Sequence, residues 1–229
     1  MNQILFEILQ SRQDLSDYVF HFTKHRNALD TLKRIVETQS ILDINKRGYL
    51  CFSDAPLTSL PSMFDIFKRY PDPMYAPYGI GIKKDYFYQS GGRPVIYGDS
   101  YERELLHPEL LWRFEMLDFN HHDFSWLREW RIRVNRMELN YDKCIAIVDT
   151  NNDIVNMRDT FFDFLDMIID AEPDDGGFTS YYTGKFKRKF KVISMEDIEE
   201  INNLSKQELN KLLEEQSEEE EIYLGSKWE

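Results

Sequence analysis

Three short segments place a chemically capable side chain within or beside an apolar run. His21 lies between two phenylalanines, Ser53 follows a strand-like apolar run, and Glu129 lies between Trp126 and Trp130. An imidazole exchanges protons near neutral pH, a hydroxyl donates and accepts hydrogen bonds, and a fixed carboxylate stabilises positive charge that develops in a reaction. The three segments therefore predict a working site if the fold brings them together.

Glu129 has the most informative surroundings. In a strand, side chains alternate between the two faces, so Glu129, Arg131 and Arg133 share one face and Trp130 lies on the other. An exposed charged face is the simplest interpretation. However, an acid set among tryptophans is more often shielded from water, and this shielding strengthens its electrostatic interactions. We therefore treat Glu129 as the central candidate.

His21 and Ser53, taken singly, have simpler structural explanations. A histidine within a strand is usually a hydrogen-bonding residue of the framework, and Ser53 suits a turn that leads into Pro56. Thr23 follows closely at the same strand end, where polar residues often line a cleft. A catalytic role requires His21, Ser53 and Glu129 to converge on one concave pocket.

Other chemistries find little support in the sequence. His107, His121, His122 and Asp123 match no common zinc-ligand spacing, and both cysteines lie elsewhere, so we predict no metal site. The glycine pairs lack the strand-to-helix context of a phosphate-binding loop, and no Gly-x-Ser-x-Gly motif of a hydrolase is present. One metal-dependent function stays as a weaker alternative, a nuclease that uses Glu129, Asp123 and His122 with a metal.

Composition indicates a globular protein. The 229 residues fit one large domain, and the 42% hydrophobic content supplies a core. A net charge of −13 disfavours general binding to nucleic acid or anionic membranes, but much of this charge lies in residues 196–229, so a nucleic-acid substrate stays open. The longest apolar stretch, 144–148, is far shorter than the ~20 residues of a membrane helix. With no visible export signal and two cysteines that we interpret as reduced core residues, we expect a cytoplasmic protein that does not bind membranes.

Strands and helices mix along the chain without regular βαβ alternation, which favours an α+β fold with a largely antiparallel or mixed sheet. Aromatic and β-branched runs predict the strands, and apolar residues at helical spacing predict the helices. The predicted strands are 18–22, 49–52, 79–82, 94–97, 130–134, 143–149 and 186–193, and the predicted helices are 4–9, 28–36, 108–117 and 161–168.

The C-terminal part of the chain carries two patterns typical of a helix capping box, Ser194 with Asp197 and Ser205 with Glu208. Each pattern is followed by a narrow apolar stripe. We therefore expect C-terminal helices. The expected organisation is a single α+β domain over 1–193, with its core in 15–150, and an acidic helical appendage over 194–229.

Taken in order, the motifs resemble a known family. The stretches HFT at 21–23, CFSD-PL at 51–57 and W-x-REWR at 126–131 are similar to those of the AbiGi-type abortive phage-resistance family, over roughly residues 15–150. The same layout resembles, more distantly, the ADP-ribosyltransferase superfamily, including DarT-like and tRNA 2′-phosphotransferase-like enzymes. These enzymes place a His or Arg on a first strand, a Ser or Tyr on a second strand and a late catalytic Glu.

The resemblance implies a split mixed sheet around a cleft, with NAD as substrate. It assigns catalytic roles to His21 and Glu129: His21 would also hydrogen-bond the adenosine-side ribose, and Glu129 would stabilise the oxocarbenium-like transition state as nicotinamide leaves. The other residues expected to contact NAD are Thr23 and Ser53 at the strand ends, Tyr75 or Tyr78 as the ring that stacks on nicotinamide, and Arg131, which would bind the pyrophosphate or position Glu129.

One departure bears on the acceptor. The superfamily often carries an acid or Gln two residues before the catalytic Glu, where this chain has Leu127. Modification of protein arginine is therefore disfavoured, and a nucleic acid or another protein acceptor stays open. We expect an ADP-ribosyltransferase-like protein of a bacterial phage-defence or toxin–antitoxin system. The alternative is a non-catalytic antitoxin or sensor on the same fold, whose acidic C-terminal helices contact a cognate toxin or antitoxin protein.

Overall fold

The computed structural model describes residues 16–56, 59–118, 125–174, 177–200, 207–208, 211 and 219–228. Its centre is a seven-stranded sheet in the order β13-β10-β4-β1-β3-β8-β5, antiparallel except for the parallel pair of β10 and β13. The fold is therefore α+β, as the sequence predicts. The strands are β1 (Tyr18–Phe22), β3 (Leu50–Ser53), β4 (Gly79–Lys83), β5 (Arg93–Pro94), β8 (Glu129–Ile132), β10 (Cys144–Val148) and β13 (Val192–Ser194).

Both faces of the sheet are covered, so the central strands are apolar on both sides. One face carries the first core, which includes Val19, Phe52 and Ile80. The opposite face carries the second core, which includes Phe20 and Ile145. Gly81 of β4 lies beneath Phe20, and a Cβ at this glycine would come within 2.9 Å of the Phe20 ring, so the close packing of the second core requires glycine here.

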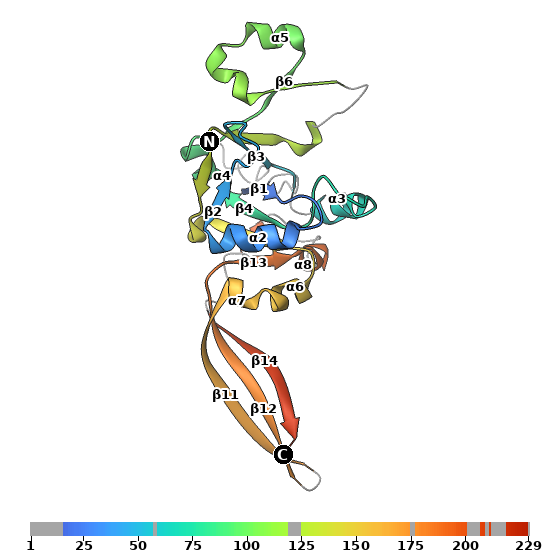
Figure 1. The fold of residues 1–229 in the computed structure, drawn as a ribbon, viewed down its shortest axis with the longest axis vertical. Coiled ribbons are helices and arrows are strands. Elements are labelled where there is room, and N and C mark those ends of the chain that lie inside the picture. The colour runs from blue at the N-terminus through green and yellow to red at the C-terminus, as the bar shows by residue number, and fades with distance from the viewer. Residues whose placement is uncertain are drawn as a thin grey trace.

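The helices divide between the two faces of the sheet (Figure 1). Helix α2 (Ala28–Glu37) buries its apolar stripe in the first core, beside α6 (Asn151–Asn156) and α7 (Arg158–Phe161). Helices α3 (Leu60–Phe67) and α8 (Met195–Glu200) contribute to the second core. Helix α4 (Lys84–Gln89) follows β4 directly and places Phe87 in the first core.

Short elements connect the sheet to the region of β6 and α5 at the top of Figure 1. Strand β6 (Ile96–Gly98) pairs in parallel with β7 (Phe114–Met116), and β2 (Ser40–Leu42) pairs with β9 (Arg136–Glu138). Helix α5 (Ser100–Leu105) begins at a capping box formed by Asp99 and Glu102. The described residues also form the 3₁₀ turns η2 (Pro108–Arg113), η3 (Ser125–Leu127) and η4 (Tyr141–Lys143).

A three-stranded antiparallel sheet extends from the body as an arm (Figure 1). It consists of β11 (Phe162–Asp174), β12 (Gly177–Arg188) and β14 (Glu219–Trp228), with β12 in the middle. The helix predicted over 161–168 is therefore wrong, because α7 ends at Phe161 and a strand follows. A bulge between Phe164 and Asp166 shifts the alternation of side chains, so the apolar residues imitate helical spacing.

Other local predictions have mixed outcomes. The capping box of Ser194 and Asp197 is confirmed, because the Asp197 amide donates to Ser194 Oγ at 2.9 Å and the Ser194 amide to Asp197 Oδ2 at 3.2 Å. The segment 108–117 is a 3₁₀ turn followed by a strand, and 219–228 is a strand where we expected a helix. The predicted helix 4–9 and Ser205 lie outside the described residues. Within the described residues, every helix is too short or too polar to cross a membrane.

Candidate functional site

Glu129 begins β8 after a sharp turn in the backbone. Arg128, the residue before it, has a φ of 46°, a left-handed conformation that is uncommon for a residue other than glycine. The Arg128 amide donates to the Ser125 carbonyl at 3.0 Å and closes η3, and the Glu129 amide donates to the hydroxyl of Tyr97 at 3.0 Å. These contacts fix the direction in which the Glu129 side chain leaves the strand.

The Glu129 carboxylate is buried and held by Arg131 from the same face of β8. Arg131 Nε donates to Glu129 Oε1 at 2.8 Å, and Nη2 donates to Oε2 at 3.3 Å. The same guanidinium donates to the carbonyls of Trp112 and Phe114 and pairs with Glu115. The predicted sharing of a face by Glu129 and Arg131 is confirmed. Two acids surround one arginine, so the formal charge of the cluster is −1.

Two neutral donors lie beside this carboxylate. Burial, together with the nearby charge of Glu129, raises the pKa of Cys51 to about 12 and that of Tyr75 to about 12. Cys51 also hydrogen-bonds Glu129 through its thiol. Both groups therefore stay protonated at neutral pH and present S–H and O–H dipoles to an anion. These neighbours and the burial of Glu129 shield its carboxylate from water.

Ser53 lies on this face too, but its hydroxyl is engaged. Ser53 Oγ donates to the Leu127 carbonyl at 2.8 Å and accepts from the Ala55 amide at 3.1 Å. The side chain thereby ties the end of β3 to the turn that precedes Glu129. This arrangement makes Ser53 a positioning residue for Glu129.

His21 lies on the opposite face of the sheet. It pairs with Ile80 of the first core, and its ring centroid is 5.4 Å from that of Phe52. Its Nδ1 is 2.9 Å from the Cys51 carbonyl, which can only accept, so Nδ1 carries the hydrogen. Burial lowers the pKa of His21, with Lys24 acting in the same direction. His21 therefore links β1 to β3 as a neutral imidazole.

Thr23 and Tyr78 lie with His21 rather than with Glu129. Thr23 is buried, and both its hydroxyl and its amide donate to the Tyr78 carbonyl at 2.8 Å. The Tyr78 ring packs against the first core, and its hydroxyl donates to Asp153 Oδ2 at 3.3 Å. These contacts organise the loop after β1. Of the two tyrosines predicted to stack on nicotinamide, only Tyr75 lies near Glu129.

The structure therefore divides the predicted site. It gathers Ser53, Tyr75, Glu129 and Arg131 and leaves His21, Thr23 and Tyr78 elsewhere. Sequence reasoning missed three neighbours of the gathered group: Cys51, Tyr97 and Glu115. Cys51 had a readable signal, because it is two residues from Ser53 and shares its face in a strand. The other two come from distant segments that carry no such signal.

Arg47 is a further neighbour that the sequence did not single out. It is exposed and within electrostatic reach of Tyr49, Cys51 and Tyr75. Tyr49 extends the same face of the chain towards the Arg131 guanidinium, which lies 4.7 Å from its ring centroid. Arg47 thus supplies positive charge near the Glu129 group.

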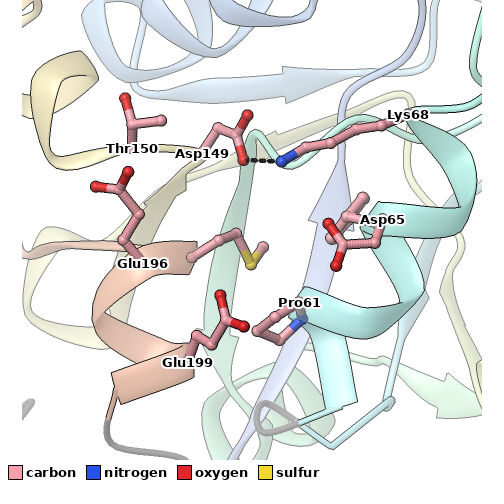
Figure 2. A pocket seen from close by; sticks show the side chains of 9 residues that line it. Pro61, Asp65, Lys68, Asp149, Thr150, Glu196 and Glu199 are labelled. Atoms are coloured by element: carbon pink, nitrogen blue, oxygen red, sulfur yellow. Dashed lines mark hydrogen bonds and ion pairs between the residues drawn. The ribbon is translucent and has the colours of Figure 1, made fainter.

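A separate pocket lies between α3, α8 and the end of β10 (Figure 2). Its volume is about 230 Å³, and Lys68 Nζ pairs across it with Asp149 Oδ1 at 2.7 Å. None of the predicted site residues lines it. Its lining residues are Pro61, Phe64, Asp65, Lys68, Asp149, Thr150, Met195, Glu196 and Glu199.

The described residues contain no candidate metal site. Among them, no three His, Cys, Asp or Glu side chains are grouped so that they could hold a metal ion. His107 instead accepts from the Glu109 amide at 3.2 Å and caps η2. His121, His122 and Asp123 lie outside the described residues.

Comparison with known proteins gives no relative. No family model matches the chain, and no match is found among curated proteins or solved structures. The resemblance to the AbiGi-type and ADP-ribosyltransferase families therefore rests on the sequence motifs.

Proposed function

We propose that the chain is an NAD-dependent ADP-ribosyltransferase-like protein of a bacterial phage-defence or toxin–antitoxin system, which transfers ADP-ribose to a nucleic acid or protein acceptor. One observation carries the proposal. The Glu129 carboxylate is fixed by Arg131 within a cluster of two acids and one arginine, and it lies within electrostatic reach of the half-buried Tyr75.

The chemistry that suits such a carboxylate is loss of nicotinamide from NAD. The bond between C1′ of the ribose and the pyridinium nitrogen breaks, and its electron pair leaves with nicotinamide. Positive charge then develops on the ribose. A preoriented carboxylate stabilises this charge, and therefore stabilises the transition state more than the ground state. An oxygen or nitrogen of the acceptor forms the new bond to C1′ and releases a proton.

The neighbouring side chains have distinct roles in this proposal. Tyr75 offers an aromatic face to nicotinamide, in keeping with one of the two sequence expectations. Arg131 positions Glu129 and does not bind the pyrophosphate, because its donors already engage Glu129, Glu115 and two carbonyls. The exposed Arg47 is better placed to meet the pyrophosphate.

The expected convergence of His21, Ser53 and Glu129 on one pocket is wrong, so the proposal depends on Glu129, Arg131 and Tyr75 alone and assigns His21 to the framework. Strands β1 and β3 pair at a single position, Phe20 with Ser53, whereas β1 and β4 pair along five positions. The His21 side chain bridges β1 and β3 through the Cys51 carbonyl. The sheet is thus only loosely joined beside the Glu129 group, which accords with a split-sheet architecture.

The position of His21 also favours the alternative, a non-catalytic antitoxin or sensor. His21, Ser53 and Glu129 do not converge on one pocket, and the Ser53 hydroxyl is engaged by the backbone. In that case, the cluster of Glu129 and Arg131 would serve only to hold β7, η2 and β8 together.

The deciding experiment measures nicotinamide release and transfer of adenine-labelled ADP-ribose, with single-stranded nucleic acid and bacterial protein offered as acceptors. Glu129→Gln should reduce both by at least about a hundredfold, the usual cost of losing one preorganised electrostatic contact. Glu115→Gln is the matched control, because it also removes an acid from Arg131 but leaves Glu129 in place. Equal losses in the two folded variants, or an inactive wild type, would support the non-catalytic alternative.

A further inference from the structure

Two exposed cations flank the ring of Tyr75. Lys24 Nζ lies 5.5 Å from the centroid of this ring, and Arg47 is within electrostatic reach of the Tyr75 hydroxyl. Within the described part of the chain, neither cationic side chain forms an ion pair or a hydrogen bond. Both positive charges are therefore available to an anionic ligand.

Backbone hydrogen bonds hold Lys24 beside the loop that carries Tyr75. The Ala76 amide donates to the Thr23 carbonyl at 3.0 Å. The amide of the residue after Lys24 donates to the Pro73 carbonyl at 3.2 Å. The residues before and after Lys24 are thus tied to both sides of Tyr75, which fixes the backbone from which the lysine side chain reaches over the ring.

The acid of this loop does not neutralise Lys24. Residues 71–78 contain one carboxylate, Asp72, and its Oδ1 lies 2.9 Å from Nδ1 of His25 in an exposed pair. The Asp72 carboxylate therefore has a partner of its own, and the charge of Lys24 stays unpaired.

Arg47 borders the Glu129 cluster from the start of β3. It precedes Tyr49 by two residues and is within electrostatic reach of the Tyr49 hydroxyl. The Tyr49 ring in turn lies 4.7 Å from the Arg131 guanidinium. The exposed Arg47 is thus placed at the outer side of the network that holds Glu129.

Charges of opposite sign are separated across Tyr75. The cluster of Glu129, Arg131 and Glu115 has a formal charge of −1, and Glu129 is buried within it. Lys24 and Arg47 lie on the exposed side. A ligand that suits this order has a centre that becomes positive and, a few bonds away, an anionic group. NAD has both, because the ribose that loses nicotinamide carries the pyrophosphate on its 5′ carbon.

We propose that Lys24 and Arg47 form a subsite for the pyrophosphate of the substrate. This assignment rests on the proposed function, in which Glu129 faces the ribose of NAD, and it adds Lys24 as a second cation beside Arg47. A pyrophosphate diester carries one negative charge on each phosphate. A guanidinium binds one phosphate through paired donors, and an ammonium binds the other as a point charge.

The subsite predicts selectivity among substrates. Nicotinamide riboside contains the same bond between C1′ and the pyridinium nitrogen but has no phosphate. The two cations should therefore favour NAD over the riboside. Because both cations are exposed, this preference should weaken at higher salt concentration.

The test measures the preference for NAD over nicotinamide riboside, as the ratio of the two kcat/KM values for nicotinamide release. Lys24→Gln should lower this ratio by about tenfold, the effect of one hydrogen bond to a charged group, through a higher KM for NAD. Arg47→Gln should lower it in the same way. Lys33→Gln is the matched control, because it removes an exposed lysine charge from α2, on the opposite face of the sheet.

Calorimetric titration with ADP-ribose separates the subsite from the reaction. ADP-ribose contains the pyrophosphate but not the bond that breaks. Lys24→Gln and Arg47→Gln should each weaken its binding by about tenfold, and the difference from the wild type should shrink at higher salt concentration. Circular dichroism would show that each variant keeps its fold.

The outcomes distinguish the subsite from the reaction. An unchanged preference for NAD in both folded variants would overturn the subsite, and the role of Glu129 would stand as long as the wild type releases nicotinamide. Equal losses with NAD and the riboside would overturn the subsite too, because the cations would then act on the reacting centre. A wild type that releases no nicotinamide would contradict the proposed function. In that case, ADP-ribose binding that depends on Lys24 and Arg47 supports the subsite, and absent or independent binding overturns it.

Discussion

His21 and Glu129 project from opposite faces of the central sheet. Phe20 pairs with Ser53, and Ser53 pairs with Glu129, so these three side chains share one face. His21 follows Phe20 and therefore points to the other side. One substrate molecule cannot touch both His21 and Glu129 without passing through the sheet. His21 can affect Glu129 only indirectly, through its hydrogen bond to Cys51 of β3 and the pairing of β3 with β8.

His21 should make the stability of the protein depend on pH. Burial lowers its pKa below the ordinary value of 6.5, so the unfolded chain takes up a proton more readily than the folded one. Stability contributed by neutral His21 is therefore present above about pH 6.5 and is lost as pH falls towards the lower pKa of the folded state. We expect urea denaturation to give a smaller free energy of unfolding at pH 5.5 than at pH 7.5.

Replacement of His21 by Asn isolates this contribution. Asn can still donate to the Cys51 carbonyl but does not titrate, and it loses the contact between the ring and Phe52. We expect a loss of about 1 kcal/mol at pH 7.5 and a flatter pH dependence below it. A variant with the full wild-type dependence on pH would contradict the assignment of a buried neutral imidazole.

Arg131 should contribute far more to stability than Arg133, two residues further along the chain. Arg131 is buried with Glu129, whereas Arg133 pairs with Glu109 while both side chains stay exposed. Arg131→Met leaves two buried or half-buried acids without their partner and should cost about 3–5 kcal/mol. Arg133→Met should cost less than about 1 kcal/mol. Urea denaturation at neutral pH measures both.

The comparison is controlled by its design, since both substitutions remove one positive charge from neighbouring positions. Similar losses of stability for the two variants would mean that the network around Arg131 does not hold β7 and η2 to β8. Addition of salt should reduce the loss of unfolding free energy caused by Arg133→Met. It should leave the loss caused by Arg131→Met nearly unchanged, because buried ion pairs are screened less.

Much of the site could be predicted where the argument needs only one strand. Alternation along a strand correctly placed Glu129 and Arg131 on one face. The acid is shielded, as expected, but not by the tryptophans, because Trp130 packs on the other face and Trp126 is exposed. The α+β class followed from the mixture of elements. These inferences depend on period and composition, which are local properties of the chain.

Relations between distant segments could not be read in this way. Whether His21 faces Glu129 depends on the register of β1, β3 and β8, and a shift of one residue reverses the answer. The bulge at Leu165 had a similar effect, since it breaks the period of two in β11 and favours a helical interpretation. Tyr97 and Glu115 reach the site from elements whose packing the sequence does not specify.

Cys51 offers a direct readout of the Glu129 carboxylate. Burial and Glu129 together raise the pKa of Cys51 to about 12, whereas burial is the first cause at Cys144, whose pKa is also raised to about 12, and no carboxylate contributes there. Only about 10⁻⁴ of either thiol is ionised at pH 8, so disulfide reagents should label the native protein slowly and the urea-unfolded protein at least about a hundredfold faster.

Glu129→Gln should speed the labelling of Cys51 by about tenfold, the effect of one pKa unit, and leave the labelling rate of Cys144 unchanged. Mass spectrometry of the labelled peptides separates the two sites. Equally faster labelling of both cysteines would indicate general loosening of the fold. An unchanged labelling rate at Cys51 would contradict the position of the Glu129 carboxylate beside this thiol.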